Sequence, residues 1–285
     1  MAKQNSRFLE VARLALEMGK KVLPLYSHLN SPHRFTLPQL NACVMLMFYL
    51  RLSYRDMEEW LLVSDKICRQ LGLEAIPDHT TLYRAYKRLR LTTFERLKRA
   101  LLDSLALQEE IIVLDTTGYR PVQASPYYMA RCGRSYRTFA KGGYAVGAES
   151  QLILGWKQDF GPAADTAFLE PLRRQAMRYG CKSHGKQAWL LLADCGFDSH
   201  TARPDDLIPP QHRGRGGPIR STTRIARFEL VSAARLDGIF GQRWKCETVN
   251  SVIKRKFGDE IRSRKLSHRK REPIVKGLIY NLHVL

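Results

Sequence analysis

The chain has 285 residues, enough for one sizeable core and a small accessory domain. Its 47 Lys and Arg against 27 Asp and Glu leave a net charge of +20, which favours a polyanionic partner. The longest apolar run, about residues 42–50, is too short to cross a bilayer, and the start has no secretory signal pattern. Six cysteines without a Cys-x-x-Cys pair exclude a disulfide framework or zinc ribbon as the expectation. We therefore expect a soluble intracellular protein with no membrane partner.

The first hundred residues have helical patterning. Apolar spacing predicts helices over residues 7–30 and 36–50, the second with Thr36 as its N-cap and Pro38 in its first turn. Ser53 and Asp56 resemble a capping box that opens another helix. Asp78 then precedes a further apolar-periodic segment. This order of helices and breaks is compatible with a helix-turn-helix.

In a helix-turn-helix, the helix that starts near Thr80 would be the one that reads DNA. It would present basic side chains to bases and phosphates, namely Arg84, Lys87 and Arg88. A plain helical bundle with a solvated basic face fits the same pattern equally well. The segment alone leaves the two interpretations open.

From residue 111 the pattern changes to short apolar runs. Residues 111–114 and 188–193 are typical of buried strands, and residues 144–148 and 152–156 of a hairpin that turns near Ser150. Residues 165–179 have helical spacing behind Asp165, interpreted as a cap, and Asp198 is interpreted as a turn residue. Leu207 and Ile208 are a possible third buried strand. The order predicts an α/β fold with a mixed sheet flanked by helices.

Two carboxylates follow the two buried strands. Asp115 and Asp194 each come at the carboxyl end of an apolar run, where open α/β sheets build their sites. If the strands are neighbours, the two side chains lie close together. Taken singly, an Asp in such a place is more often a turn former or helix cap.

A third carboxylate belongs to a helix-like run over residues 240–254. On a single helix, Phe240, Arg243, Glu247 and Lys254 would share one narrow stripe beside the apolar face. The alternative is that Glu247 and Lys254 are ordinary surface charges of an amphipathic helix.

Together these residue types suit phosphodiester chemistry. Asp115, Asp194 and Glu247 supply the oxygen ligands that a pair of Mg²⁺ ions requires for an in-line displacement. Arg243 and Lys254 would hold phosphate oxygens nearby. These three carboxylates are thus the candidate catalytic and metal-binding residues.

The chain resembles the DDE class of insertion-sequence transposases. Phe240-(2)-Arg243-(3)-Glu247-(6)-Lys254 is similar to the Tyr-(2)-Arg-(3)-Glu-(6)-Lys signature of one large branch. The Leu-Asp-Thr-Thr-Gly-Tyr around Asp115 and the Ala-Asp-Cys-Gly-Phe-Asp-Ser around Asp194 resemble that branch's other two motifs. The resemblance covers about residues 36–285. Phe240 departs from it, because the family usually has a tyrosine there.

The resemblance implies a ribonuclease-H-like catalytic domain at residues 109–285, after a helical DNA-binding domain at residues 1–108. It implies Mg²⁺ as cofactor, two ions with Mn²⁺ as a substitute, double-stranded DNA as partner, and a homodimer on paired element ends in the cytoplasm, associated with the nucleoid. A basic loop at about residues 201–227 would contact DNA through residues that include Arg213 and Arg215. Lys141 is either a further DNA contact or simply solvated.

The activity implied is cleavage at the terminal inverted repeats, followed by attack of the 3′-hydroxyl on target DNA. Two alternatives stay open. One is a catalytically inactive, transposase-derived DNA-binding protein, for which metal would be dispensable. The other is a nuclease of the same fold that cuts without joining.

Overall fold

The computed structural model describes residues 6–121, 130, 131, 133, 139–211, 219 and 221–285. Contacts divide the chain into two compact units. Unit 1 comprises residues 1–105, 256–258 and 275–285, and unit 2 comprises residues 106–255 and 259–274. Each unit is described by itself. Among the described residues, no helix combines the length and apolar character needed to span a membrane.

Unit 1 is helical. Its elements are α1 (Arg7–Val22), α2 (Leu37–Tyr49), α3 (Tyr54–Leu62), α4 (Asp65–Leu71), α5 (His79–Arg88), α6 (Leu91–Leu102), the 3₁₀ turn η1 (Asp103–Leu105) and the last part of α11 (Leu266–Val284). The first helix is shorter than the predicted 7–30. Pro24 disfavours a helical conformation at the preceding residue, and Leu23 is indeed extended, with ψ 145°.

The predicted caps of unit 1 are confirmed. Thr36 and Gln39 form a reciprocal capping box at α2, and Ser53 and Asp56 form another at α3. The Asp78 carboxylate accepts the backbone N–H groups of Thr80 and Thr81 at the start of α5. These bonds satisfy amides that the first helical turn leaves without a partner.

One face of α5 is buried and the other is charged. Leu82, Ala85 and Tyr86 pack inward, whereas the predicted DNA-contacting residues Arg84, Lys87 and Arg88 are exposed. This amphipathic arrangement suits both a recognition helix and a bundle helix. The helix-turn-helix therefore stays a prediction.

Unit 2 is built on a mixed sheet. The strands β1 (Ile111–Pro121), β2 (Ala140–Gly147), β3 (Ile153–Phe160) and β6 (Leu190–Leu192) follow the order β3-β2-β1-β6. The first three are antiparallel neighbours, and β6 is parallel to β1. A short β7 (Glu260–Ile261) pairs with the far end of β1, and β4 (Lys182–Ser183) with β5 (Lys186–Gln187) forms a separate hairpin. The predicted hairpin and the two central strands are confirmed, but β1 continues past the predicted residue 114 to Pro121, so Asp115 lies within the strand and not at its end.

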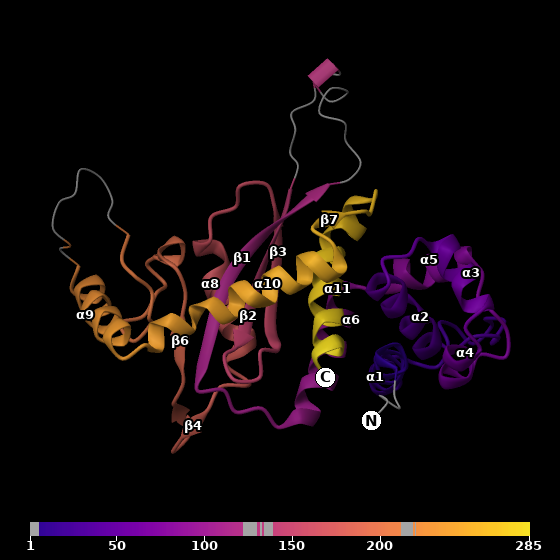
Figure 1. The fold of residues 1–285 in the computed structure, drawn as a ribbon, viewed down its shortest axis with the longest axis horizontal. Coiled ribbons are helices and arrows are strands. Elements are labelled where there is room, and N and C mark those ends of the chain that lie inside the picture. The colour runs from indigo at the N-terminus through magenta and orange to yellow at the C-terminus, as the bar shows by residue number, and fades with distance from the viewer. Residues whose placement is uncertain (1–5, 122–129, 132, 134–138, 212–218, 220) are drawn as a thin grey trace. The chain divides into compact units, whose positions relative to one another are not determined.

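Helices flank this sheet on both faces. Successive strand residues point to opposite faces: a Cβ at Gly143 of β2 would meet the Phe168 ring of α8 (Thr166–Ala176), whereas the neighbouring Tyr144 hydroxyl donates to the Pro273 carbonyl of α11. In Figure 1, α10 (Trp244–Phe257) crosses in front of the strands. Helix α9 (Thr222–Leu236) and the 3₁₀ turns η2 (Cys195–Phe197) and η3 (Ile239–Arg243) complete the unit. The predicted mixed α/β sheet flanked by helices is thus confirmed, and it is consistent with a ribonuclease-H-like domain.

Two details of the prediction are wrong. The run over residues 240–254 is not one α-helix, because Ile239–Arg243 form a 3₁₀ turn and α10 begins at Trp244. Gly238 precedes the turn in the left-handed region, at φ 75°, and Gly241 is a poor helix former within it. Leu207 and Ile208 form no strand, but only a single parallel bridge between Leu207 and Leu192.

The interior of unit 1 contains a titratable pair that predicts a pH dependence. Nδ1 of His283 lies 2.9 Å from the Tyr49 hydroxyl, and burial, with nearby positive charges, lowers the pKa of His283 to about 4. The unfolded chain binds a proton near pH 6.5, where folded His283 remains neutral. The stability associated with His283 is therefore full above about pH 6.5 and is lost as the pH falls toward 4. Urea unfolding of His283→Gln, compared with wild type between pH 7 and 4, should show a weaker loss in the variant.

The matched control is His200→Gln, which changes an exposed histidine. An identical fall of stability in wild type and His283→Gln would contradict this interpretation.

Candidate active site

The register between β1 and β6 brings the two predicted aspartates to one level. Val113 is opposite Leu192 in this parallel pair, so Asp115 and Asp194 each lie two residues further toward the carboxyl end. Asp115 is still within β1, and Asp194 follows β6 in an extended conformation. The Asp194 carboxylate accepts the backbone N–H of Gly196 at 2.9 Å, which fixes it at the start of η2. The sequence-based expectation that these two strands are neighbours is confirmed.

Asp115 is held in a strongly polar setting. It accepts Nδ2 of Asn250 at 2.8 Å and the backbone N–H of Thr116 at 2.8 Å. Burial and the negative charges of Asp194 and Glu247 raise the pKa of Asp115, while the two hydrogen bonds oppose this rise. All three predicted carboxylates therefore act electrostatically on one region.

Helix α10 brings the third carboxylate. Its buried side, with Cys246, Val249 and Ile253, packs in the core, so Glu247 lies at the edge of the helix with 51% of its side chain exposed. Nη2 of Arg243 is 2.6 Å from Oε1 of Glu247. Lys254 is half-buried about two helical turns further on. The Arg243 and Glu247 side chains thus meet even though Arg243 precedes α10.

Asn250 is a functional candidate that the sequence interpretation missed. It lies three residues after Glu247, on the same side of α10, and this spacing was the available signal. Its Nδ2 binds Asp115, but its Oδ1 is buried and accepts no hydrogen bond within the described part of the chain. An unsatisfied oxygen beside a buried carboxylate is costly unless another group uses it.

These groups fit a divalent metal by their chemistry. Asp115, Asp194 and Glu247 offer carboxylate oxygens, with the unsatisfied Asn250 oxygen beside them, and hard cations prefer oxygen ligands. Within the described residues, however, no three His, Cys, Asp or Glu side chains lie together as a metal-binding group. The chemical fit is therefore good, while metal binding by these residues belongs to the proposals below.

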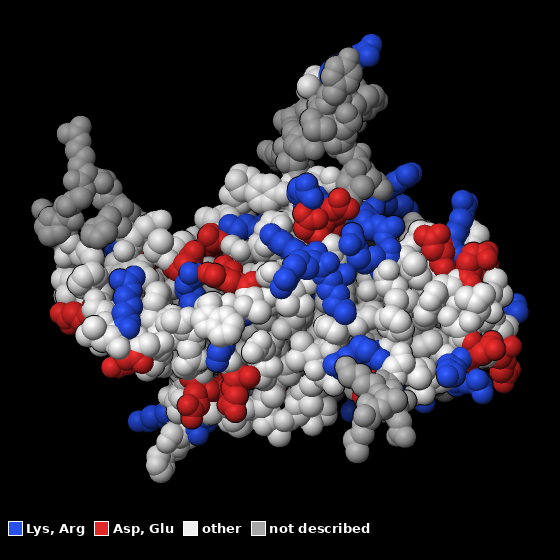
Figure 2. Space-filling model, viewed as in Figure 1, with Lys and Arg blue, Asp and Glu red and all other residues white. Residues whose placement is uncertain are grey.

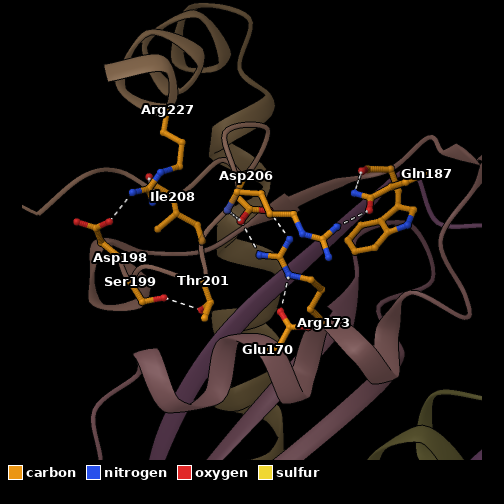
Figure 3. Close-up of polar contacts among 11 residues, drawn as sticks. Glu170, Arg173, Gln187, Asp198, Ser199, Thr201, Asp206, Ile208 and Arg227 are labelled. Carbon is orange, nitrogen blue, oxygen red and sulfur yellow. Dashed lines mark hydrogen bonds and ion pairs between the residues drawn. The ribbon is translucent and has the colours of Figure 1, made fainter. Parts of the chain in front are cut away.

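The segment after Asp194 is anchored by a buried ion pair (Figure 3). Asp198 accepts a hydrogen bond from Nη2 of Arg227 at 2.5 Å. Its other oxygen lies 2.8 Å from Nη2 of Arg224 and accepts the backbone N–H of Gln211. Burial disfavours ionisation of Asp198, but the bonds and charges of these partners outweigh it and lower its pKa. The interpretation of Asp198 as a turn residue is therefore incomplete, because its carboxylate joins this segment to α9.

A second buried pair lies beside it in Figure 3. The Arg173 guanidinium of α8 donates to both oxygens of Asp206, at 2.9 and 2.5 Å. Oδ2 of Asp206 also accepts the backbone N–H of Arg203. This bidentate pair holds the chain around Asp206 against α8, a helix that covers the sheet.

Asp165 and Lys141 also differ from their interpretation. Asp165 occupies the N-cap position of α8, yet its side chain caps no backbone amide there. It pairs instead with Lys141, at 2.6 Å, and accepts the hydroxyl of Thr116. Lys141 is thus neither simply solvated nor clearly available to DNA. Arg213 and Arg215, predicted to contact DNA, lie outside the described residues.

Basic side chains gather near α10 in the charge view (Figure 2). They lie over α10 and β7, and acidic side chains lie beside them on the same face. In the sequence from α10 to the start of α11, the exposed basic residues of unit 2 include Arg255, Arg262, Arg264, Lys265 and Lys270. A positive surface next to carboxylates suits a polyanion whose phosphates are the reacting groups.

A mixed sheet with an aspartate in β1, another just after β6, a glutamate on an adjoining helix and a basic face is the arrangement expected of a nucleic-acid-processing α/β domain. The family model for the Transposase DDE domain matches residues 106–282, which is more than half of the chain. The chain belongs to this family and is a DDE-type transposase. A comparison with curated proteins found no match.

The Asn250 contact predicts a role in activity. Asn250→Leu removes the donor to Asp115 at similar volume. If Asp115 binds a metal ion, metal-dependent DNA cleavage should fall about 10- to 100-fold, as when partners of metal ligands are lost. The rate of single-turnover cleavage measures this effect. Ser251→Ala, an exposed neighbour on α10, is the matched control. Cleavage by Asn250→Leu at the rate of this control would show that the Asn250 bond is dispensable.

The Asp198 pair predicts a stability effect. Asp198→Asn leaves Arg227 buried without its full counter-charge, and breaking such pairs lowers the free energy of unfolding by about 3–5 kcal/mol. Urea denaturation measures this loss, with Asp205→Asn, at a nearby exposed position, as control. Equal stability of the two variants would disprove a structural role for the pair.

Proposed function

We propose that this transposase cleaves DNA at the terminal inverted repeats of an insertion sequence and joins the resulting 3′-hydroxyl to target DNA. The observation that supports this most is the common level of Asp115 in β1 and Asp194 just after the parallel strand β6, with Glu247 acting on Asp115 electrostatically. The membership of the Transposase DDE domain family supports the same reaction class.

Asp115, Asp194 and Glu247 would hold Mg²⁺, two ions being the expected number and Mn²⁺ a substitute. When bound, the metal supplies a Lewis acid that favours ionisation of the attacking hydroxyl and neutralises charge at the phosphate. Glu247 would have to exchange its contact with Arg243 for this role. The Asn250 amide would keep the Asp115 carboxylate oriented.

Arg243 and Lys254 would bind phosphate oxygens of the reacting strand. A guanidinium released from Glu247 offers two parallel donors, and an ammonium offers a point charge. In strand transfer, the 3′-hydroxyl oxygen forms a new bond to phosphorus while the bond to the leaving 3′-oxygen of the target strand breaks. Two cationic side chains beside the carboxylates would stabilise the charge that develops on that phosphate.

The helices of unit 1 would recognise the element ends. Helices α3, α4 and α5 would act as a helix-turn-helix, with Arg84, Lys87 and Arg88 facing DNA. The basic segment with Arg213 and Arg215 would add phosphate contacts, and a homodimer would hold two ends together. These assignments rest on the exposed basic face of α5, the positive net charge and the resemblance to insertion-sequence transposases.

The test is a cleavage and strand-transfer assay on DNA that carries the element's own ends, taken from the flanks of the gene. Glu247→Gln should bind these ends with the affinity of wild type, but its cleavage and joining should fall at least about 10³-fold, because a ligand is lost without a change in shape. The matched control is Glu229→Gln, an exposed glutamate of α9.

The outcomes separate the alternatives. Cleavage without joined products would indicate a nuclease of the same fold. Tight, salt-sensitive binding without any cutting, in Mg²⁺ or Mn²⁺, would contradict the enzyme and leave a DNA-binding protein. Full activity of Glu247→Gln would exclude Glu247 from catalysis.

A further inference from the structure

We propose that Asp165 is a positioning residue that fixes Asp115 and Asp194 relative to each other, with Lys141 as its counter-ion. The proposal rests on the proposed function, because it assigns a role in that same site. It adds a fourth carboxylate to the three that the sequence pattern identified.

One oxygen of Asp165 is directed toward Asp115. Oδ1 accepts the hydroxyl of Thr116 at 2.5 Å, and the backbone N–H of the same threonine donates to Asp115 at 2.8 Å. Thr116 is thus held from its side chain while its amide orients the neighbouring carboxylate. A change at Asp165 would release the threonine rotamer and loosen the amide bond to Asp115.

The other oxygen of Asp165 lies beside the η2 turn. A Cβ placed on Gly196 would lie 2.7 Å from Oδ2 of Asp165 and 3.0 Å from Oδ1 of Asp194. Both carboxylates therefore approach the same glycine, whose backbone N–H donates to Asp194. A side chain at position 196 would have to displace one of these carboxylates.

The local geometry argues against an ordinary helix cap. An aspartate at an N-cap normally accepts an amide of the first turn, but Asp165 makes no such bond in α8. Its Oδ1 contacts groups of β1 and β2 instead, and its Oδ2 lies beside Gly196 of the η2 turn. The Asp165 side chain therefore connects elements around the site and does not cap the helix that it precedes.

The positive charge of Lys141 balances the negative charge of the Asp165 carboxylate. Its ammonium lies 2.6 Å from Asp165, donates to the Ala163 carbonyl and lies 5.7 Å from the centre of the Phe168 ring. The side chains of Lys141 and Asp165 are only 16% and 23% exposed, so solvent screens the pair weakly. Without a cation here, a further negative charge would raise the repulsion among the carboxylates.

The experiment compares Asp165→Asn, Asp165→Glu and wild type in the full chain. Single-turnover cleavage is measured at saturating DNA, the dissociation constant for element ends is measured separately, and Mn²⁺ binding without DNA is measured by electron paramagnetic resonance. Asp165→Asn should cleave about 10- to 100-fold more slowly and bind Mn²⁺ about tenfold more weakly, with DNA affinity unchanged. Asp165→Glu should restore part of both losses.

Thr116→Val provides a second variant that keeps the side-chain shape and removes only the hydroxyl donor. It should reproduce part of the loss in cleavage, and Thr116→Ser should restore it. The matched control is Asp159→Asn, which removes an exposed carboxylate of β3. Melting curves exclude a merely structural effect, because the Mn²⁺ and cleavage losses should occur without a comparable loss of stability.

Each outcome decides the proposal. The role of Asp165 would be overturned if Asp165→Asn and Thr116→Val had the cleavage rate and Mn²⁺ affinity of the control Asp159→Asn. If Glu247→Gln were inactive in the same experiment, the proposed function would still stand. The role of Asp165 would also be overturned if Asp165→Asn and Asp165→Glu lost cleavage rate and Mn²⁺ affinity equally, in proportion to a fall in melting temperature. A wild-type protein that neither binds Mn²⁺ nor cuts DNA would overturn the proposed function, and the role of Asp165 with it.

Discussion

The parallel pairing of β1 with β6 is the constraint on which the candidate site depends. Three buried or half-buried residue pairs from Ile111–Leu190 to Val113–Leu192 set the register. Because side chains alternate between faces, a slip of one residue would turn one strand's aspartate to the other face of the sheet. The apolar runs thus do more than build a core, since their alignment brings Asp115 and Asp194 to the same level.

Beyond the sheet, buried ion pairs anchor the chain that follows η2. Between η2 and residue 211, the last described residue before a gap, the chain forms no named helix or strand, and Asp198 with Arg227 and Asp206 with Arg173 anchor it. Each pair joins a carboxylate of this stretch to a buried guanidinium of α8 or α9, so the geometry of the two pairs constrains its path.

The features predictable from the sequence were local or periodic. Apolar runs identified the central strands, and cap residues such as Thr36 and Asp78 identified helix starts. The start of α10 was missed because the conformation of Gly238 interrupts an otherwise helical pattern. The spacing of Asn250 after Glu247 was a signal in the sequence, but its contact with Asp115 was not. The contact of Asp165 with Lys141 likewise joins residues that are distant in the chain, and only the fold brings such partners together.

The direction of the Asp115 pKa shift shows that ionisation of this carboxylate costs free energy in the folded protein. Burial and two neighbouring carboxylates raise the pKa of Asp115, so folded Asp115 retains a proton at pH values where the unfolded chain has lost it. Stability therefore decreases as the pH rises through that pKa. A cation bound to the ionised carboxylate would offset part of this cost, of which burial is the largest cause and the charges of Asp194 and Glu247 a smaller one.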